Sequence, residues 1–225
     1  MRVVTILVVC LVALPLCAED PSAQVSLGDV VQEIKRVANG YPPKVDGPEH
    51  RADIEKKWRW AEAGLLEYIA GLHSPNSGVE LLLGDLYRMG YNLDIDDCGP
   101  KAVERLSRAS SLDPRNPNPY YSLGRHYTFS SEAEKGELEL LRGYALAGPE
   151  NGTPFLFDLA WNNYFQKRFE ATVVLADRYL AKHPGDKSIV TVREFAQQAL
   201  EGREIRTIEI PVEGLPDGKL KIEQE

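Results

Sequence analysis

The stretch KAVERLSRASSLDPRNPNPYYSLGRHY (101–127) decides the fold of this 225-residue chain. A fixed spacing of 0, 4, 7 and 12 runs through its first half and is held by Ala102, Leu106, Ala109 and Pro114. Gly124 follows ten residues after the proline. The segments ASSLDPRN (109–116) and YALAGPEN (144–151) are two versions of one helix end, and AKHPGD (181–186) is a looser third. Recurrence of this kind is typical of repeat proteins, which stack helical units into an extended binding surface.

Apolar periodicity and helix-stop residues predict the remaining organisation. Helices are expected over 25–39, 52–72, 79–89, 101–111, 120–129, 131–147, 155–165, 169–182 and 188–200. After residue 205 the period changes to two, since Ile208, Ile210 and Val212 alternate with other residues. The turn residues Pro216-Asp217-Gly218 follow, so the tail is expected to form a β-hairpin.

The first residues have the features of a secretory signal peptide. A positively charged start precedes 14 apolar residues (3–16), a run too short to cross a bilayer comfortably. Cleavage is expected after Ala18, with export to a periplasm or to the outside and no integral membrane span afterwards. A retained anchor is one alternative. Lipid attachment at Cys17 is another, although Leu16 is bulky where such a site needs a small residue.

The charge balance argues against nucleic acid and anionic lipid as partners. The chain has 26 Lys and Arg residues against 34 Asp and Glu, a net charge of −8. Removal of residues 1–18 takes away Arg2 alone, which leaves 25 against 34 and a net charge of −9. Phosphate binding depends on clusters of Lys and Arg, and the sequence has none. Of three cysteines only Cys98 remains after cleavage, so no internal disulfide is expected.

The helix pairs resemble the tetratricopeptide repeat (TPR) in the spacing of small, aromatic and proline positions. The first unit is carried by Gly84, Tyr87, Ala102, Leu106, Ala109 and Pro114. It has six extra residues between its helices, and in this it is similar to the Sel-one-like repeat. The second unit is carried by Gly124, Tyr127, Gly136 or Glu137, Leu140 or Leu141, Tyr144 and Pro149. The third is carried by Ala160, Thr172, Ala176, Tyr179 and Pro184.

This resemblance covers about residues 52–200 and implies the fold. The expectation is an all-α, right-handed superhelix of antiparallel helix pairs, a TPR-like α-solenoid, with a short C-terminal β-hairpin. A plain helical bundle without repeat symmetry is the alternative. The domains expected are a signal peptide (1–18), an N-terminal segment with one helix and a Pro/Gly loop (19–50), the repeat domain (51–202) and the hairpin tail (203–225).

The resemblance also implies where a partner would bind. In the family, the first helix of each pair lines a concave groove that suits an extended peptide or a partner helix. The matching positions are Leu81, Asp85, Arg88, Tyr121, Arg125, Thr128, Phe157, Trp161 and Tyr164. The same alignment adds Met89, Asn118, Phe129 and Phe165, of which the last two favour the core. Tyr, Trp and Arg are the residue types that concentrate binding energy in interfaces.

Sequence signals for chemistry are weak. Asn92, Asp94 and Asp96 have the alternate spacing of a calcium loop, but the required Gly and Glu are missing, so a solvated loop is expected. No cofactor, metal or catalytic motif is indicated. The function expected is an exported TPR-type interaction module without catalysis. One alternative is an exported small-molecule binder or enzyme with a pocket near Arg125, His126 and Trp161. Another is strand addition by the hairpin to a partner sheet.

Overall fold

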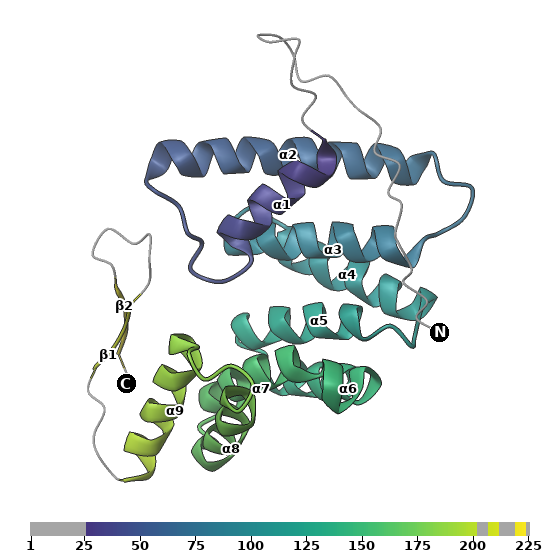
Figure 1. Ribbon diagram of the computed structural model, residues 1–225. Coiled ribbons are helices and arrows are strands. Elements are labelled where there is room, and N and C mark those ends of the chain that lie inside the picture. Colours follow the sequence, from purple (N-terminus) through teal and green to yellow (C-terminus); the bar gives the residue numbers. More distant parts are fainter. Residues whose placement is uncertain (1–25, 202–206, 212–218, 224–225) are drawn as a thin grey trace.

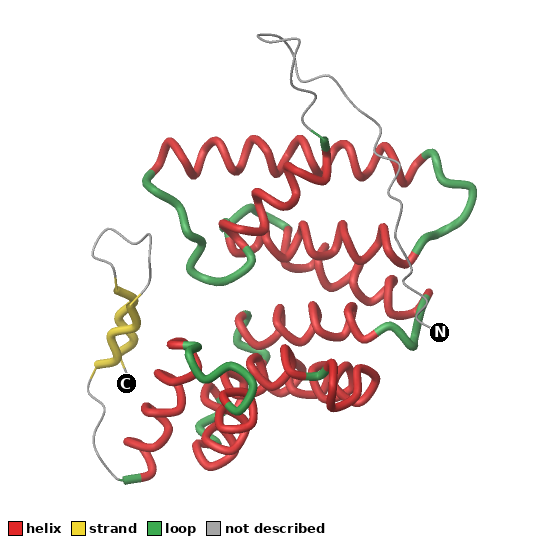
Figure 2. Tube along the Cα trace, viewed as in Figure 1, coloured by secondary structure: helices red, strands yellow, loops and turns green. Residues whose placement is uncertain are grey.

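The computed structural model describes residues 26–201, 207–211 and 219–223 (Figure 1). This part of the chain is all-α apart from two short strands (Figure 2). Its helices are α1 (Leu27–Ala38), α2 (Pro48–Ala70), α3 (Ser77–Asn92), α4 (Cys98–Leu112), α5 (Pro117–Phe129), α6 (Ala133–Asn151), α7 (Thr153–Phe165), α8 (Phe169–Leu180) and α9 (Lys187–Leu200).

Strands β1 (Thr207–Pro211) and β2 (Lys219–Glu223) pair antiparallel, with Ile208 opposite Ile222 and Ile210 opposite Leu220. The turn at 212–218 lies outside the described residues, so the predicted hairpin as a unit stays a prediction. The predicted signal peptide (1–18) also lies outside them.

Short polar side chains begin several helices, because the first N–H groups of a helix have no partner within it. Asn76 Oδ1 accepts from the N–H groups of Gly78 and Val79 at the start of α3. The side chain of Asn116 does the same for α5, and that of Asp186 for α9. The loops between helices therefore also set where each helix starts.

Each helix packs against the next in the chain, and the odd-numbered helices also contact one another in order. Helix α3 contacts α1 and α5, and α7 contacts α5 and α9. In Figure 1 these helices descend through the molecule from α1 to α9. Helices α3, α5 and α7, which carry the predicted partner-contact residues, are therefore neighbours in the structure.

Close helix contact depends on glycine at two matching positions. A Cβ on Gly84 would lie 2.7 Å from Leu106 Cγ, and a Cβ on Gly124 would lie 2.5 Å from Leu140 Cγ. Both distances are far shorter than van der Waals contact, so only glycine fits without movement of the leucine. Leu140 is fully buried whereas Leu141 is half exposed, so Leu140 is the one of these two residues that packs against Gly124.

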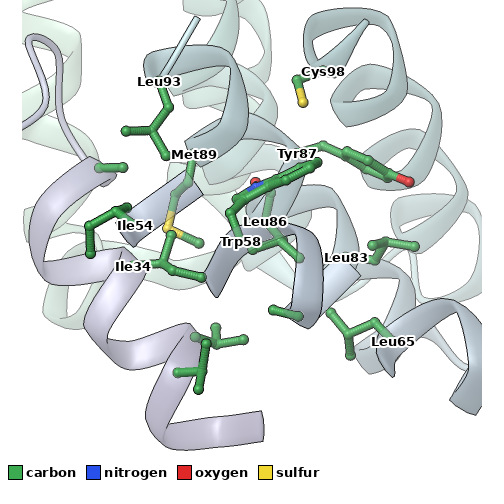
Figure 3. Packing of buried hydrophobic residues seen from close by; sticks show 14 of the residues in the cluster. Ile34, Ile54, Trp58, Leu65, Leu83, Leu86, Tyr87, Met89, Leu93 and Cys98 are labelled. Atoms are coloured by element: carbon green, nitrogen blue, oxygen red, sulfur yellow. The ribbon is translucent and has the colours of Figure 1, made fainter. Parts of the chain in front are cut away.

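The largest core cluster joins α1, α2, α3 and the start of α4 (Figure 3). Trp58 lies at its centre, with its ring tilted against Tyr87 at a centroid distance of 5.9 Å. The indole Nε1 donates a hydrogen bond of 2.7 Å to the carbonyl of Leu86. Ile54, Trp58, Ala61 and Leu65 are buried, as the apolar period of this helix predicts.

Several helix ends differ from the sequence predictions by two to four residues. Helix α2 starts at Pro48 and α5 at Pro117, because proline suits the first helical turn, where its missing N–H costs nothing. Helix α4 starts at Cys98 rather than three residues later. The segment assigned to α6 continues to Asn151 through a kink at Gly148, which has φ +72°.

Candidate functional site

Arg88 and Asn39 connect α3 to the link that follows α1. The guanidinium donates from Nη1 to the Asn39 carbonyl at 2.9 Å and from Nη2 to Asn39 Oδ1 at 2.7 Å. Its Nε donates to Asp85 Oδ1 at 3.1 Å. Arg88 is buried, so these bonds replace the water that its charge would otherwise hold.

Arg125 extends the same network to α5 and α7. Its Nη1 donates to Asn39 Oδ1 at 3.3 Å, so one amide oxygen accepts from both arginines. Its Nε lies 3.3 Å from Asp158 Oδ1, an ion pair across the α5–α7 contact. The guanidinium also stacks on the ring of Tyr121 at 5.6 Å from the centroid. A chain of polar contacts therefore crosses three helices from Asp85 to Asp158.

Asp158 is the most deeply buried charged group of this network, with no exposed surface. Burial raises the pKa of its carboxyl group, whereas Arg125, Tyr121 and Arg88 act in the opposite direction. Neither carboxylate oxygen has a well-directed hydrogen bond. The Asp158 carboxylate is therefore stabilised mainly by nearby positive charge. Removal of Arg125 would leave a buried charge without its ion-pair partner, which destabilises the fold.

The nine residues predicted to contact a partner divide into two groups. Five keep part of their surface exposed, namely Leu81, Asp85, Tyr121, Arg125 and Phe157. The other four are buried, namely Arg88, Thr128, Trp161 and Tyr164. The burial of Trp161 and Tyr164 follows from the position of α7, which packs against α5, α6, α8 and α9. Partner contact for the whole set stays a prediction, and the five partly exposed residues are the ones available to a partner.

The buried residues have contacts of their own. Thr128 Oγ1 accepts a hydrogen bond of 2.7 Å from Asn162 Nδ2, which ties α5 to α7. Trp161 and Tyr164 form edge contacts with each other and pack around Phe165, which is 41% exposed. The side chains of Trp161 and Tyr164 therefore belong to the packing between helices.

His126 lies under the surface at the end of α5. Its ring meets Tyr91 edge-on at a centroid distance of 5.0 Å, and its Nδ1 has no partner among the described residues. Burial, with a contribution from Arg88, lowers the pKa of His126 to about 4. The imidazole is therefore neutral at neutral pH.

Sequence reasoning missed the joining role of Asn39. This residue sits at the end of α1, in a position that no repeat motif marks. Asp158 was also missed, because it was not among the predicted partner-contact residues. A buried aspartate flanked by aromatic residues (FLFDLAW, 155–161) was the available signal.

Two of the clefts on the described surface lie near the ends of α3. The larger, of about 460 Å³, lies at the ends of α3 and α5, and the smaller, of about 160 Å³, lies between α2 and α3. Neither is lined by Arg125, His126 or Trp161, the residues of the alternative pocket. Across the described residues, no three His, Cys, Asp or Glu side chains come together as a metal site would require.

Comparisons of the chain with protein-family models, with curated proteins and with solved structures found no match. In the described part of the chain, no helix combines the length and the apolar character that a membrane span requires.

Proposed function

We propose that the chain is an exported interaction module of TPR type that binds an extended segment or a helix of another protein along α3, α5 and α7. In this proposal the helix pairs form a right-handed superhelix, and these three helices line its inner face. The role is binding without catalysis.

The observation that supports the proposal is the polar chain from Asp85 through Arg88, Asn39 and Arg125 to Asp158. A buried network of this kind costs desolvation energy and gives a plain helical bundle little net stability. It does hold three neighbouring helices in fixed register, which a preformed binding face needs.

The surface above this network offers mixed chemistry. Leu81 and Phe157 are apolar and partly exposed, Tyr121 is aromatic, and Asp85 carries a negative charge. Aromatic and apolar anchors beside a charge are the usual composition of a protein-binding face.

Photo-crosslinking tests the proposal. A photoreactive phenylalanine analogue is placed at Asn118, an exposed position of α5 in the predicted groove, and in a matched protein at Leu138, which is 68% exposed on α6. In extracts of the producing cells, position 118 is expected to give one discrete crosslinked protein that position 138 does not give. Equal crosslinking from both positions, or none from 118, contradicts the proposal.

A further inference from the structure

The larger cleft has a distinctive lining. It opens where the link after α1 approaches the ends of α3 and α5, and it has a volume of about 460 Å³. We name it the aromatic–acidic cleft, because its side chains include Tyr41, Tyr91, Phe129, Asp94, Asp96 and Asp97. Tyr41 is 57% exposed and Tyr91 37%, so their rings are available to a ligand. The volume falls within the range of sites that hold small molecules or single side chains.

The charged residues that line this cleft are all acidic. No Lys or Arg is among its lining residues. Arg51, from outside the cleft, pairs with Asp94 at 2.9 Å and also donates to the carbonyl of Leu93. Within the described part of the chain, Asp96 and Asp97 form no ion pair, and both are exposed. Asp97 precedes α4 without a capping bond from its side chain, so its carboxylate is not used by the helix.

A neutral histidine lies behind the wall. The His126 side chain is only 5% exposed, and its ring packs edge-on against Tyr91. Its Cε1 lies 3.7 Å from the point where a Cβ on Gly99 would stand, so it sits directly behind two lining residues. Its Nδ1 is unpartnered among the described residues. Because burial keeps this imidazole neutral, it places no positive charge against the cleft.

We propose that the aromatic–acidic cleft binds an organic cation, an alkylammonium or guanidinium group. The face of an aromatic ring carries partial negative charge and attracts cations within about 6 Å of its centre. The carboxylates of Asp96 and Asp97 add direct attraction, and the net charge of −8 adds a favourable long-range field. A bare metal ion is the poorer occupant, because no three ligating side chains converge in the described residues.

Two sources present the same chemistry. One is a free small cation, and the other is a Lys or Arg side chain of a bound chain. The cleft shares only Phe129 with the wider set of predicted groove positions, and none of the five partly exposed contact residues lines it. Failure of either proposal is therefore distinguishable from failure of the other.

The test is a titration followed by amide chemical shifts of the isotopically labelled protein. The probes are choline, arginine amide and 3,3-dimethylbutanol, an uncharged analogue of choline with nearly the same shape. Both cations are expected to shift the amides of Asp96, Asp97 and Gly99 saturably, and the alcohol is expected to leave them unchanged. Equal shifts with the alcohol overturn the proposal, and so does the absence of saturable shifts with either cation.

Variants assign the effect to named groups. Asp96→Asn with Asp97→Asn is expected to weaken binding of both cations about tenfold, since two close charges are lost. The control Glu104→Gln with Glu134→Gln changes the net charge equally at exposed positions on α4 and α6 and is expected to leave affinity unchanged. Equal weakening by both pairs contradicts a local site.

Tyr41→Leu gives an independent reading if the double variant fails to fold, which thermal unfolding reports. Leucine keeps apolar bulk and removes the aromatic face, so a loss of about threefold in choline affinity is expected. Unchanged affinity contradicts the role of the ring.

A peptide with one central arginine then separates the two sources of the cation. A tenfold gain over arginine amide identifies a chain as the ligand, and equal affinity identifies a free cation.

Discussion

Arg125 on α5 and Asp158 on α7 form an ion pair, with 3.3 Å between Nε and Oδ1, beneath the face predicted to bind a partner. Asp158 has no exposed surface, and the Arg125 side chain is 13% exposed. Asn39 then connects the same arginine to Arg88. One pair thus connects the packing of α7 to the loop that follows α1.

Removal of Arg125 is expected to destabilise the fold. Arg125→Met leaves the Asp158 charge buried without its partner, at a cost of about 3 kcal/mol in the free energy of unfolding. Addition of Asp158→Asn removes that charge and is expected to recover at least half of the loss. Urea unfolding followed by circular dichroism measures both. Strictly additive losses in the double variant contradict the coupling.

The stability of the protein is expected to fall between pH 6.5 and pH 4 because of His126. Burial lowers the pKa of His126 to about 4 from 6.5, so the unfolded chain binds a proton in this window that the folded chain does not. The loss amounts to about 3 kcal/mol at most across the window.

His126→Phe is expected to remove this part of the pH dependence, as measured by urea unfolding at pH 6.5 and pH 4.5. Asp158 acts in the opposite direction, because its raised pKa lets the folded chain take up a proton first. Its contribution is present in both proteins and cancels in the comparison. Identical pH slopes for the two proteins contradict the buried state of His126.

Substitution of Gly124 is expected to disrupt the α5–α6 contact. The new Cβ of Gly124→Ala would stand 2.5 Å from Leu140 Cγ, and the strain is expected to cost about 1–3 kcal/mol of unfolding free energy. Gly185→Ala is the matched control, since nothing lies within 4 Å of the added Cβ. Thermal unfolding compares the two. A control as unstable as the Gly124 variant refutes the packing argument.

Cys98 is expected to be inert towards thiol reagents in the folded protein. It is 1% exposed, and burial raises its pKa to about 12, so almost no thiolate is present at neutral pH. In a Cys10→Ser, Cys17→Ser protein, a chromogenic disulfide reagent is expected to react only after addition of denaturant. Rapid reaction without denaturant shows that the Cys98 environment is wrong.

Helix positions were largely predictable from the sequence, because apolar spacing reports which face of a helix is buried. The match is close in α2, where Ile54, Trp58, Ala61 and Leu65 all face the core. Helices α2 and α5 start earlier than predicted, because Pro48 and Pro117 begin helices although proline is also common in links. Proline occurs both in links and in the first turn of helices. At Pro117 the helix start is indicated by Asn116, whose side chain caps α5.

The candidate site was less predictable. Repeat spacing placed Arg88 and Arg125 on neighbouring helices, but it treated both as surface groups. Their partner Asn39 lies 49 residues before Arg88 and 86 before Arg125, at the end of the first predicted helix and outside the three aligned repeat units. Asp158 was marked only by its apolar and aromatic neighbours, whereas periodicity assigns charged residues to the outside. Long-range polar pairing becomes visible only when the helices are placed in space.

Hydrogen exchange with and without the crosslinked partner tests the central proposal most directly. Binding along the inner face is expected to slow amide exchange in α3, α5 and α7 while α4, α6 and α8 exchange at unchanged rates. Protection confined to α4, α6 and α8, or to the paired strands β1 and β2, would contradict it.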